Sequence, residues 1–136
     1  MILVKLLIKS ILSITTAFFL RRSCILLENI HKIRYSKDIM ELNVPVKYRQ
    51  DIENATKLLK DEGCQAVFLF GSLVTGKINN NSDIDLGVKG LPKNRYFDVY
   101  SRIYFDLENK IDLVDFDVNS DFYSMLNKIG EVVQIG

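Results

Sequence analysis

Residues 66–88 decide the fold of this chain, and they contain AVFLFGS at 66–72 and SDIDLGV at 82–88. The apolar run before Gly71 is typical of a buried strand. Gly71 ends that strand at a point where the backbone must approach another group closely, and Ser72 adds a hydroxyl and a free amide. The second stretch alternates apolar and polar residues, a pattern that predicts another strand. We therefore expect two strands, joined by a segment that begins with a glycine turn.

Two carboxylates share one face of the second strand. Asp83 and Asp85 lie two positions apart, and side chains at i and i+2 point the same way from a strand. Like charges this close repel each other unless a cation lies between them. Oxygen ligands of this kind suit Mg²⁺, which proteins usually hold through one or two carboxylates together with substrate phosphates. A phosphate-binding turn beside a carboxylate pair predicts metal-dependent handling of a nucleoside triphosphate.

A third acid is expected from the strand pattern IDLVDFD at residues 111–117. Asp112 lies between the apolar residues Ile111 and Leu113, as Asp85 lies between Ile84 and Leu86. Asp115 lies three positions further on, so it should face the opposite side of the strand. Only one of these two can join the carboxylate pair, and we favour Asp112. Asp117 shares the parity of Asp115 and is placed on the solvent side or at the strand end.

Helical patterns separate the expected strands 66–70, 83–89 and 111–117. Pro45 suits the first turn of a helix that carries an apolar stripe and ends at Gly63. Pro92 opens a second helix. Its expected apolar face consists of Tyr96, Val99, Tyr100, Ile103 and Leu107. A last helix is marked by Phe122, Met125, Leu126 and Ile129, and a final edge strand by residues 132–135. Helices alternate with strands, so the expected fold class is α/β.

The combination of Gly71 and Ser72 with Asp83, Asp85 and the later Asp112 resembles the minimal nucleotidyltransferases of the DNA polymerase β superfamily. The resemblance covers the whole globular part of the chain. It implies a small mixed β-sheet with flanking helices. It also implies two Mg²⁺ ions held by the three aspartates, and transfer of AMP from ATP to an acceptor hydroxyl. Asp112 is implied to complete one metal site and to orient or deprotonate that hydroxyl.

The resemblance also implies how the triphosphate is held. Gly71, Ser72 and neighbouring backbone amides would contact the phosphates at the start of a short helix. Many members of the family carry an arginine soon after the glycine-serine pair, whereas this chain has LVTG at residues 73–76. Lys77 is then the nearest cation for the triphosphate, and we assign it that contact.

A rival motif overlaps the same segment. GSLVTGK at residues 71–77 fits the first seven positions of a P-loop, and it follows a strand. The eighth position of a P-loop is Ser or Thr, which holds Mg²⁺, but here it is Ile78. A P-loop also continues into a helix, whereas NNNS at residues 79–82 is a turn-forming cluster. A nucleotidyltransferase turn is therefore favoured over a P-loop.

The implied partner is a protein. Minimal nucleotidyltransferases commonly pair with a HEPN-type ribonuclease toxin, so the resemblance implies an antitoxin that transfers AMP to a side chain of that toxin, a tyrosine hydroxyl. One alternative is an antitoxin that acts by binding alone, for which the three acids would be dispensable. The other is a small-molecule adenylyltransferase that modifies an antibiotic, which would need an added substrate domain not recognised in this sequence.

Charge is divided unevenly along the chain. Residues 1–40 carry seven Lys and Arg against two Asp and Glu, a balance of +5, while residues 41–136 carry eleven against fifteen, a balance of −4. The acidic balance of the second part argues against direct nucleic-acid binding, which would show a basic footprint. His31 is the only histidine and is assigned to the surface or an interface. Cys24 and Cys64 lack a metal or redox spacing, so we expect reduced thiols in a cytoplasmic protein.

Residues 1–40 are predicted to be an apolar and basic extension ahead of a nucleotidyltransferase domain at 41–136. The apolar run from Ile11 to Leu20 is only ten residues long, whereas a membrane span needs about twenty. Three interpretations stay open for this extension. It is an unnatural addition ahead of a start at Met40, a membrane anchor, or a packed helix. Membrane association through this segment is the alternative to a purely cytoplasmic location.

Overall fold

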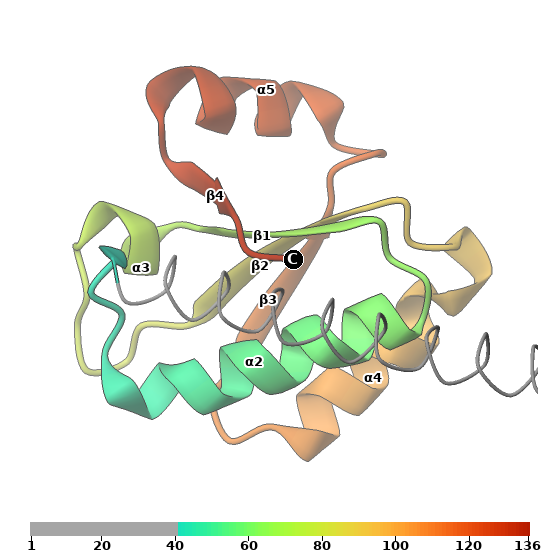
Figure 1. Ribbon diagram of the computed structural model, residues 1–136, viewed down its shortest axis with the longest axis horizontal. Helices are drawn as coiled ribbons and strands as arrows, with labels where there is room; N and C mark the ends of the chain where they lie inside the picture. The colour runs from blue at the N-terminus through green and yellow to red at the C-terminus, as the bar shows by residue number, and fades with distance from the viewer. Residues whose placement is uncertain (1–40) are drawn as a thin grey trace, which may run out of the picture. The chain divides into compact units, whose positions relative to one another are not determined.

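The computed structural model describes residues 41–136 (Figure 1). The predicted extension over residues 1–40 lies outside the described residues, together with His31 and Cys24. Its three interpretations therefore stay open. Within residues 41–136, no helix combines the length and the apolar character that crossing a membrane requires.

Four strands form one mixed sheet in the order β3-β2-β1-β4. The strands are β1 (Ala66–Phe70), β2 (Ile84–Lys89), β3 (Ile111–Asp115) and β4 (Val132–Gln134). β1 pairs antiparallel with both β2 and β4, whereas β2 and β3 run parallel. A parallel pair needs a crossover connection, which the helical segment between β2 and β3 provides. The predicted α/β class with a small mixed sheet is confirmed.

The helical elements are α2 (Val46–Asp61), α3 (Ser72–Thr75), the 3₁₀ turn η1 (Lys93–Arg95), α4 (Tyr96–Asp106) and α5 (Ser120–Ile129). Pro45 lies at the N-cap of α2, and Gly63, with a φ of 91°, follows its end, as predicted. Pro92 opens the 3₁₀ turn, and the second helix follows it. The turn after Pro92 is 3₁₀ and not α-helical because the Arg95 amide donates to the Pro92 carbonyl, three residues earlier, at 2.8 Å.

Strand β3 is shorter than the predicted range 111–117. Oδ1 of Asp115 accepts hydrogen bonds from the backbone amides of Asp117 at 2.8 Å and Val118 at 3.3 Å. An aspartate that binds the amide two residues on creates a turn, so the strand ends at Asp115. Asp117 lies past the strand end, where its Oδ2 accepts a bond from the Gly90 amide at 2.7 Å.

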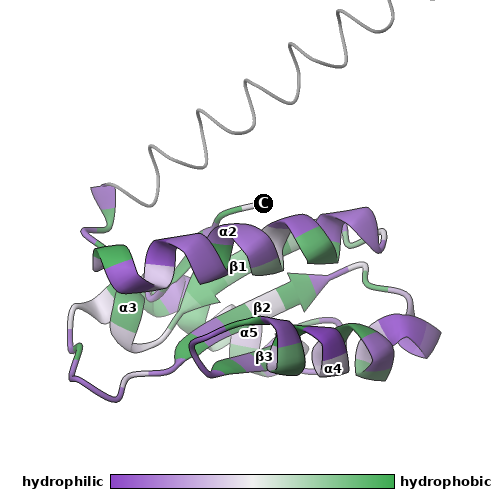
Figure 2. Ribbon diagram, turned by 90° about the horizontal axis from the view of Figure 1, so that it is seen from below, coloured by the Kyte–Doolittle hydropathy of each residue, from purple (hydrophilic) through white to green (hydrophobic). Residues whose placement is uncertain are grey.

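The two faces of the sheet are covered by different helices. α2 and α4 lie on one face, and α5 lies on the other (Figure 1). Strand residues alternate between these faces. The side facing α2 and α4 includes the fully buried Val67, Leu69, Ile84, Leu86 and Val88. The side facing α5 holds a buried cluster of Phe68, Phe70, Phe116 and Leu126. Figure 2 shows β1 and β2 as largely hydrophobic, whereas much of α2 is hydrophilic.

Gly87 makes room for the cluster under α5. A Cβ atom at this position would lie 2.0 Å from a ring atom of Phe116, so a larger residue would displace that ring. Asp85, two positions earlier, has the same strand parity and therefore faces the same side, but it is only partly buried. The α5 face of β2 thus changes from a packed aromatic centre to an acidic end.

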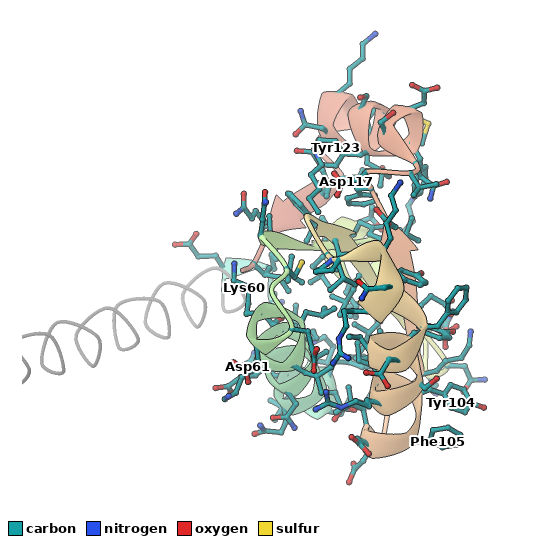
Figure 3. The ribbon with its side chains drawn as sticks, turned by 90° about the vertical axis from the view of Figure 1, so that its right-hand side faces the viewer. Lys60, Asp61, Tyr104, Phe105, Asp117 and Tyr123 are labelled. Atoms are coloured by element: carbon teal, nitrogen blue, oxygen red, sulfur yellow. The ribbon has the colours of Figure 1, made fainter. Side chains whose placement is uncertain are left out.

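The helices bury part of their predicted apolar faces. On α4, Val99 and Ile103 are buried, and Tyr96 and Tyr100 are partly buried. Tyr104 and Phe105 extend from the end of α4 away from the sheet and are 62% and 80% exposed (Figure 3). On α5 only one of the four marker residues is buried. That residue is Leu126, whereas Phe122, Met125 and Ile129 are exposed.

A group of charged residues joins α2 to α4, and we call it the α2–α4 clamp: Glu62, Arg95, Asp98 and Arg102. The Glu62 carboxylate, which follows α2, accepts hydrogen bonds from both arginines. Arg95 also pairs with Asp98 at 3.2 Å. The hydrogen bond from Arg95, supported by Arg102, lowers the pKa of Glu62. Glu62 therefore stays ionised beside the two arginine side chains that donate to it.

Cys64 is a buried free thiol, as the sequence predicts. Its Sγ donates to the carbonyl oxygens of Ala66 at 3.1 Å and Lys89 at 3.2 Å. Burial raises the pKa of this thiol above its usual value, which keeps it protonated and poorly nucleophilic. Cys64 therefore contributes packing between β1 and β2 rather than chemistry.

Candidate active site

The glycine turn after β1 lies directly against a carboxylate. Gly71 has φ 71° and ψ −147°, a conformation that is essentially restricted to glycine. A Cβ atom here would lie 2.1 Å from Oδ2 of Asp85. The predicted close approach at Gly71 is confirmed, and the group approached is the Asp85 side chain. Any other residue at this position would be strained in its backbone and would displace that carboxylate.

Ser72 begins the short helix α3, as the sequence predicts for the residue after the glycine. The amides of Val74 and Thr75 donate to the Gly71 carbonyl at 3.1 Å and 3.0 Å, so the amides of α3 that are available to an anion are those of Ser72 and Leu73. The helix is one turn long and ends at Gly76, which is left-handed with φ 76°. A P-loop requires a long helix after this turn. The chain instead forms a loop over residues 76–83, so the structure argues against a P-loop.

Asp85 and Asp112 lie side by side on adjacent parallel strands. They are directly paired in the register of β2 and β3, so their side chains project from the same face. Asp83 immediately precedes β2 and has the parity of Asp85. Partial burial raises the pKa of Asp85, and the charges of Asp112 and Asp83 raise it further, while Lys110 lowers it. The three predicted acids therefore form one group whose negative charge is only partly balanced.

Asp115 takes no part in this group. It pairs in register with Val88, three residues from the position of Asp112, and its Oδ1 stabilises the turn after β3. The structure thus brings Asp112 beside Asp85 and gives Asp115 a structural contact. This placement follows the alternation of strand side chains from which Asp112 is predicted.

Lys110 is a residue of the group that the sequence reasoning missed. Its Nζ donates to Oδ2 of Asp83 at 2.6 Å and to Oδ2 of Asp112 at 3.3 Å. The hydrogen bond to Asp83, followed by that to Asp112, raises the pKa of the lysine. The signal in the sequence is the two-residue spacing between Lys110 and Asp112, because it places both side chains on the same face.

A buried aspartate anchors the start of β3. Oδ2 of Asp51, on α2, accepts bonds at 2.7 Å from both the backbone amide and the side-chain amide of Asn109. Asp51 is 6% exposed, so this contact is shielded from water. Asn109 comes directly before Lys110, and Ile84 donates its amide to the Lys110 carbonyl at 2.9 Å. These contacts fix the position of Lys110 and Asp112 along β2, which is the register between the two strands.

Lys77, the predicted phosphate contact, lies in the exposed loop after Gly76. Among residues 41–136, no hydrogen bond or ion pair connects it to the three aspartates; the two ion pairs of these carboxylates both come from Lys110. The structure therefore leaves the assignment of Lys77 as a prediction.

The donor set suits Mg²⁺, although the side chains are not gathered around one point. Three carboxylates provide hard oxygen ligands, and their mutual repulsion at Asp85 would be relieved by a further cation. Over the part of the chain that the structure describes, no three acidic, histidine or cysteine side chains converge closely enough to hold a metal ion. Asp83 and Asp112 are instead directed at Lys110. The chemistry fits the ion, and side-chain rotation away from Lys110 would be needed to bind it.

Comparison with known proteins identifies a protein family that this chain matches. The family described as "Polymerase beta, Nucleotidyltransferase" matches residues 53–133, which include every acid of the site. No curated protein matches the chain.

Solved structures resemble the same part of the chain. One, a toxin-antitoxin with AMP-PNP, is 29% identical with a TM-score of 0.50, over 62% of this chain and 72% of that one. Another, the toxin-antitoxin MntA-HepT, is 24% identical with a TM-score of 0.47, over 65% and 71%. A third is a tri-AMPylated Shewanella oneidensis HEPN toxin in complex with an MNT antitoxin, at 22% identity and a TM-score of 0.46, over 65% and 71%.

Proposed function

Because the chain belongs to the polymerase β nucleotidyltransferase family, we propose that it is the catalytic antitoxin of a toxin–antitoxin pair. In this proposal it transfers AMP from ATP to a tyrosine hydroxyl of a HEPN-type toxin, with Mg²⁺ as cofactor. One observation carries the proposal. The Gly71 turn lies so close to Asp85 that a Cβ would overlap its carboxylate, and Asp112 is paired with Asp85 across the sheet. A phosphate-binding turn and paired acids thus meet at one place.

The turn would bind the triphosphate. The Ser72 hydroxyl and the amides at the start of α3 face an anion without competition from helix bonds. Lys77, at the end of the same turn, would add positive charge from the exposed loop. The restricted backbone of Gly71 allows these groups to lie next to Asp85. The phosphates would therefore be held directly beside the acids.

Asp83, Asp85 and Asp112 would hold Mg²⁺. When bound, the metal neutralises phosphate charge and lowers the pKa of a coordinated hydroxyl. The acceptor oxygen forms a bond to the α-phosphorus of ATP, while the bond from that phosphorus to the pyrophosphate oxygen breaks. Asp112 accepts the hydroxyl proton, which then passes to solvent, and pyrophosphate leaves. The protein contributes mainly by positioning these groups.

The nucleotide and the partner are supported by the structure that is 29% identical, a toxin-antitoxin with AMP-PNP, because AMP-PNP is an ATP analogue. The acidic charge of residues 41–136 agrees with a protein partner more than with a nucleic acid. A cytoplasmic location fits a reaction that consumes ATP.

A second candidate function is neutralisation of the toxin by binding alone. The observation that favours it is the ion-pairing of Asp83 and Asp112 with Lys110, which gives these acids a partner within the chain. The two functions differ in whether the acids are needed. A binding-only antitoxin would neutralise equally well with all three replaced by Asn.

The test is incubation of the full chain with a purified HEPN-type toxin as the candidate partner, Mg²⁺ and ATP labelled in the α-phosphate. We expect label on a toxin tyrosine, located by mass spectrometry as added AMP, and loss of toxin ribonuclease activity. Asp85→Asn should transfer no label. Asp115→Asn is the matched control, since it removes the same charge from the neighbouring strand at a position that faces away from the three acids. Full neutralisation of the toxin by Asp85→Asn without label would establish binding as the mechanism.

A further inference from the structure

We propose that Lys110 is an internal counter-cation, which holds the acids together while no metal is bound and is displaced when a divalent cation enters. This inference rests on the proposed function, because it concerns the metal of the same site. It differs from the usual role of an active-site lysine, which is to contact substrate. Lys110 would instead compete with the metal for two of its ligands.

The geometry places the ammonium group where a cation is needed. Nζ of Lys110 lies 2.6 Å from Oδ2 of Asp83, just before β2, and 3.3 Å from Oδ2 of Asp112 on β3. Both distances are those of direct ion pairs. An ammonium group is a compact point charge with three donors, so it can replace a metal ion between carboxylates more closely than a planar guanidinium can.

The backbone of Lys110 is fixed while its side chain is free to leave. Its carbonyl accepts the Ile84 amide at 2.9 Å, and Asn109 before it is tied to Asp51. The side chain itself is 58% exposed. Exposed ion pairs contribute little net stability, because water solvates both partners well. Displacement of the ammonium group would therefore cost little, and the released lysine could turn into solvent without moving the strand.

The third acid explains why the lysine is an incomplete substitute. Lys110 has no ion pair with Asp85, whose pKa is raised by partial burial and by the charges of Asp112 and Asp83. One positive charge thus faces three negative ones. A divalent cation would satisfy the group better, but it must first remove Asp83 and Asp112 from the lysine. This competition accounts for the failure of the three carboxylates to converge within residues 41–136.

The experiment measures metal binding rather than transfer. Mn²⁺ is titrated into the full chain, with and without AMP-PNP, and free Mn²⁺ is followed by electron paramagnetic resonance. Three variants are compared with the wild type: Lys110→Met, Lys110→Arg and Lys128→Met. Lys128 is exposed on α5, so its variant removes the same charge outside the site. Melting in EDTA gives the stability of the metal-free state.

We expect Lys110→Met to bind Mn²⁺ about threefold more tightly or better, in line with the loss of two exposed ion pairs that compete with the metal. The same variant should melt a few degrees lower in EDTA and regain the difference with Mn²⁺. Lys110→Arg keeps the positive charge but not the compact ammonium group, so its Mn²⁺ affinity should lie between those of the wild type and Lys110→Met. Lys128→Met should bind Mn²⁺ as the wild type does. The side chain is exposed, so Lys110→Met should fold, and circular dichroism checks this.

Two results would overturn the inference while leaving the proposed function intact. One is Mn²⁺ binding by Lys110→Met that is equal to or weaker than that of the wild type. The other is unchanged Mn²⁺ binding with weaker AMP-PNP binding, which would make Lys110 a phosphate contact. Failure of the wild type to bind Mn²⁺ under either condition would overturn the metal site of the proposed function, and the inference with it.

Discussion

Two groups of charged residues in this domain use the same interactions, but the charges are matched in one group and mainly negative in the other. In the α2–α4 clamp, one glutamate accepts bonds from two arginines, and Asp98 pairs with one of them. In the candidate active site, one lysine faces three aspartates. The clamp therefore lowers the pKa of Glu62, while the site raises that of Asp85. Matched charges maintain a helix contact, whereas an excess of one sign leaves a place for a ligand of the other sign.

The largest effect should come from removing an acid of the unbalanced group. Asp85→Asn is expected to reduce AMP transfer by about a hundredfold or more, because the metal that would neutralise the phosphate charge loses one of its three carboxylate ligands. Its metal-free form should melt slightly higher than the wild type, since one of three like charges is removed. Labelled transfer and melting in EDTA test both statements. Transfer near the wild-type rate would remove Asp85 from the site.

Asp112 and Asp115 allow an acid of the candidate site to be compared with a structural acid on the same strand. Asp112→Ala should lose transfer, and Asp115→Ala should keep it but lose about 1 kcal/mol of stability, because the amides of Asp117 and Val118 lose their acceptor. Side-by-side rates and urea unfolding measure the two effects. If the Asp115 variant is inactive and the Asp112 variant active, the assignment of the third acid is wrong.

The clamp should respond in stability alone. Glu62→Gln removes the charge that both arginines contact, so the melting temperature should fall by a few degrees while the transfer rate per folded molecule stays the same. Calorimetry and a rate measurement well below the melting temperature separate these quantities. A reduced rate at full folding would mean that the packing of α4 also positions the site.

The smallest expected effect is the dependence of stability on pH, and the two groups should show it with opposite signs. The pKa of Asp85 is raised above 3.8, so its ionised form disfavours folding, and this penalty grows as pH rises from 3.8 through the raised value. The pKa of Glu62 is lowered below 4.5, so its contribution is complete above 4.5 and is lost as pH falls through the lowered value.

The two variants should therefore diverge from the wild type in opposite directions. Asp85→Asn should gain relative stability as pH rises across this window, and Glu62→Gln should lose it. Urea unfolding from pH 3 to 7 measures both curves (a range chosen to bracket the ordinary values of about 4). Curves of the same sign would contradict the contrast between the two groups.

The parts of the fold and of the candidate site that could be predicted from the sequence are those that depend on local patterns such as strand alternation. The strand alternation that places Asp85 and Asp112 on one face depends on the chain alone, so their proximity follows from the sequence. The predicted end of β3 is wrong because the strand end depends on a hydrogen bond that the Asp115 side chain accepts from the Asp117 amide, which the apolar pattern does not reveal. Lys110 was missed for a related reason. A long flexible side chain can reach several partners, and the folded pairing of β2 and β3 determines that Lys110 contacts Asp83 as well as Asp112.

The pairing between β2 and β3 also limits where the chain can change in length without separating the acids. Asp85 faces Asp112 because the strands are in register, and the number of residues between them plays no part in that pairing. The connection through α4 could lengthen or shorten without separating the acids, provided that β3 keeps its alignment. A shift of one residue in that alignment would send Asp112 to the opposite face. The interval from Gly71 to Asp85 is different, since the Gly71 backbone lies directly against the Asp85 side chain. Relatives should therefore vary in length mainly after β2, and a pattern that fixes the spacing to the third acid would overlook them.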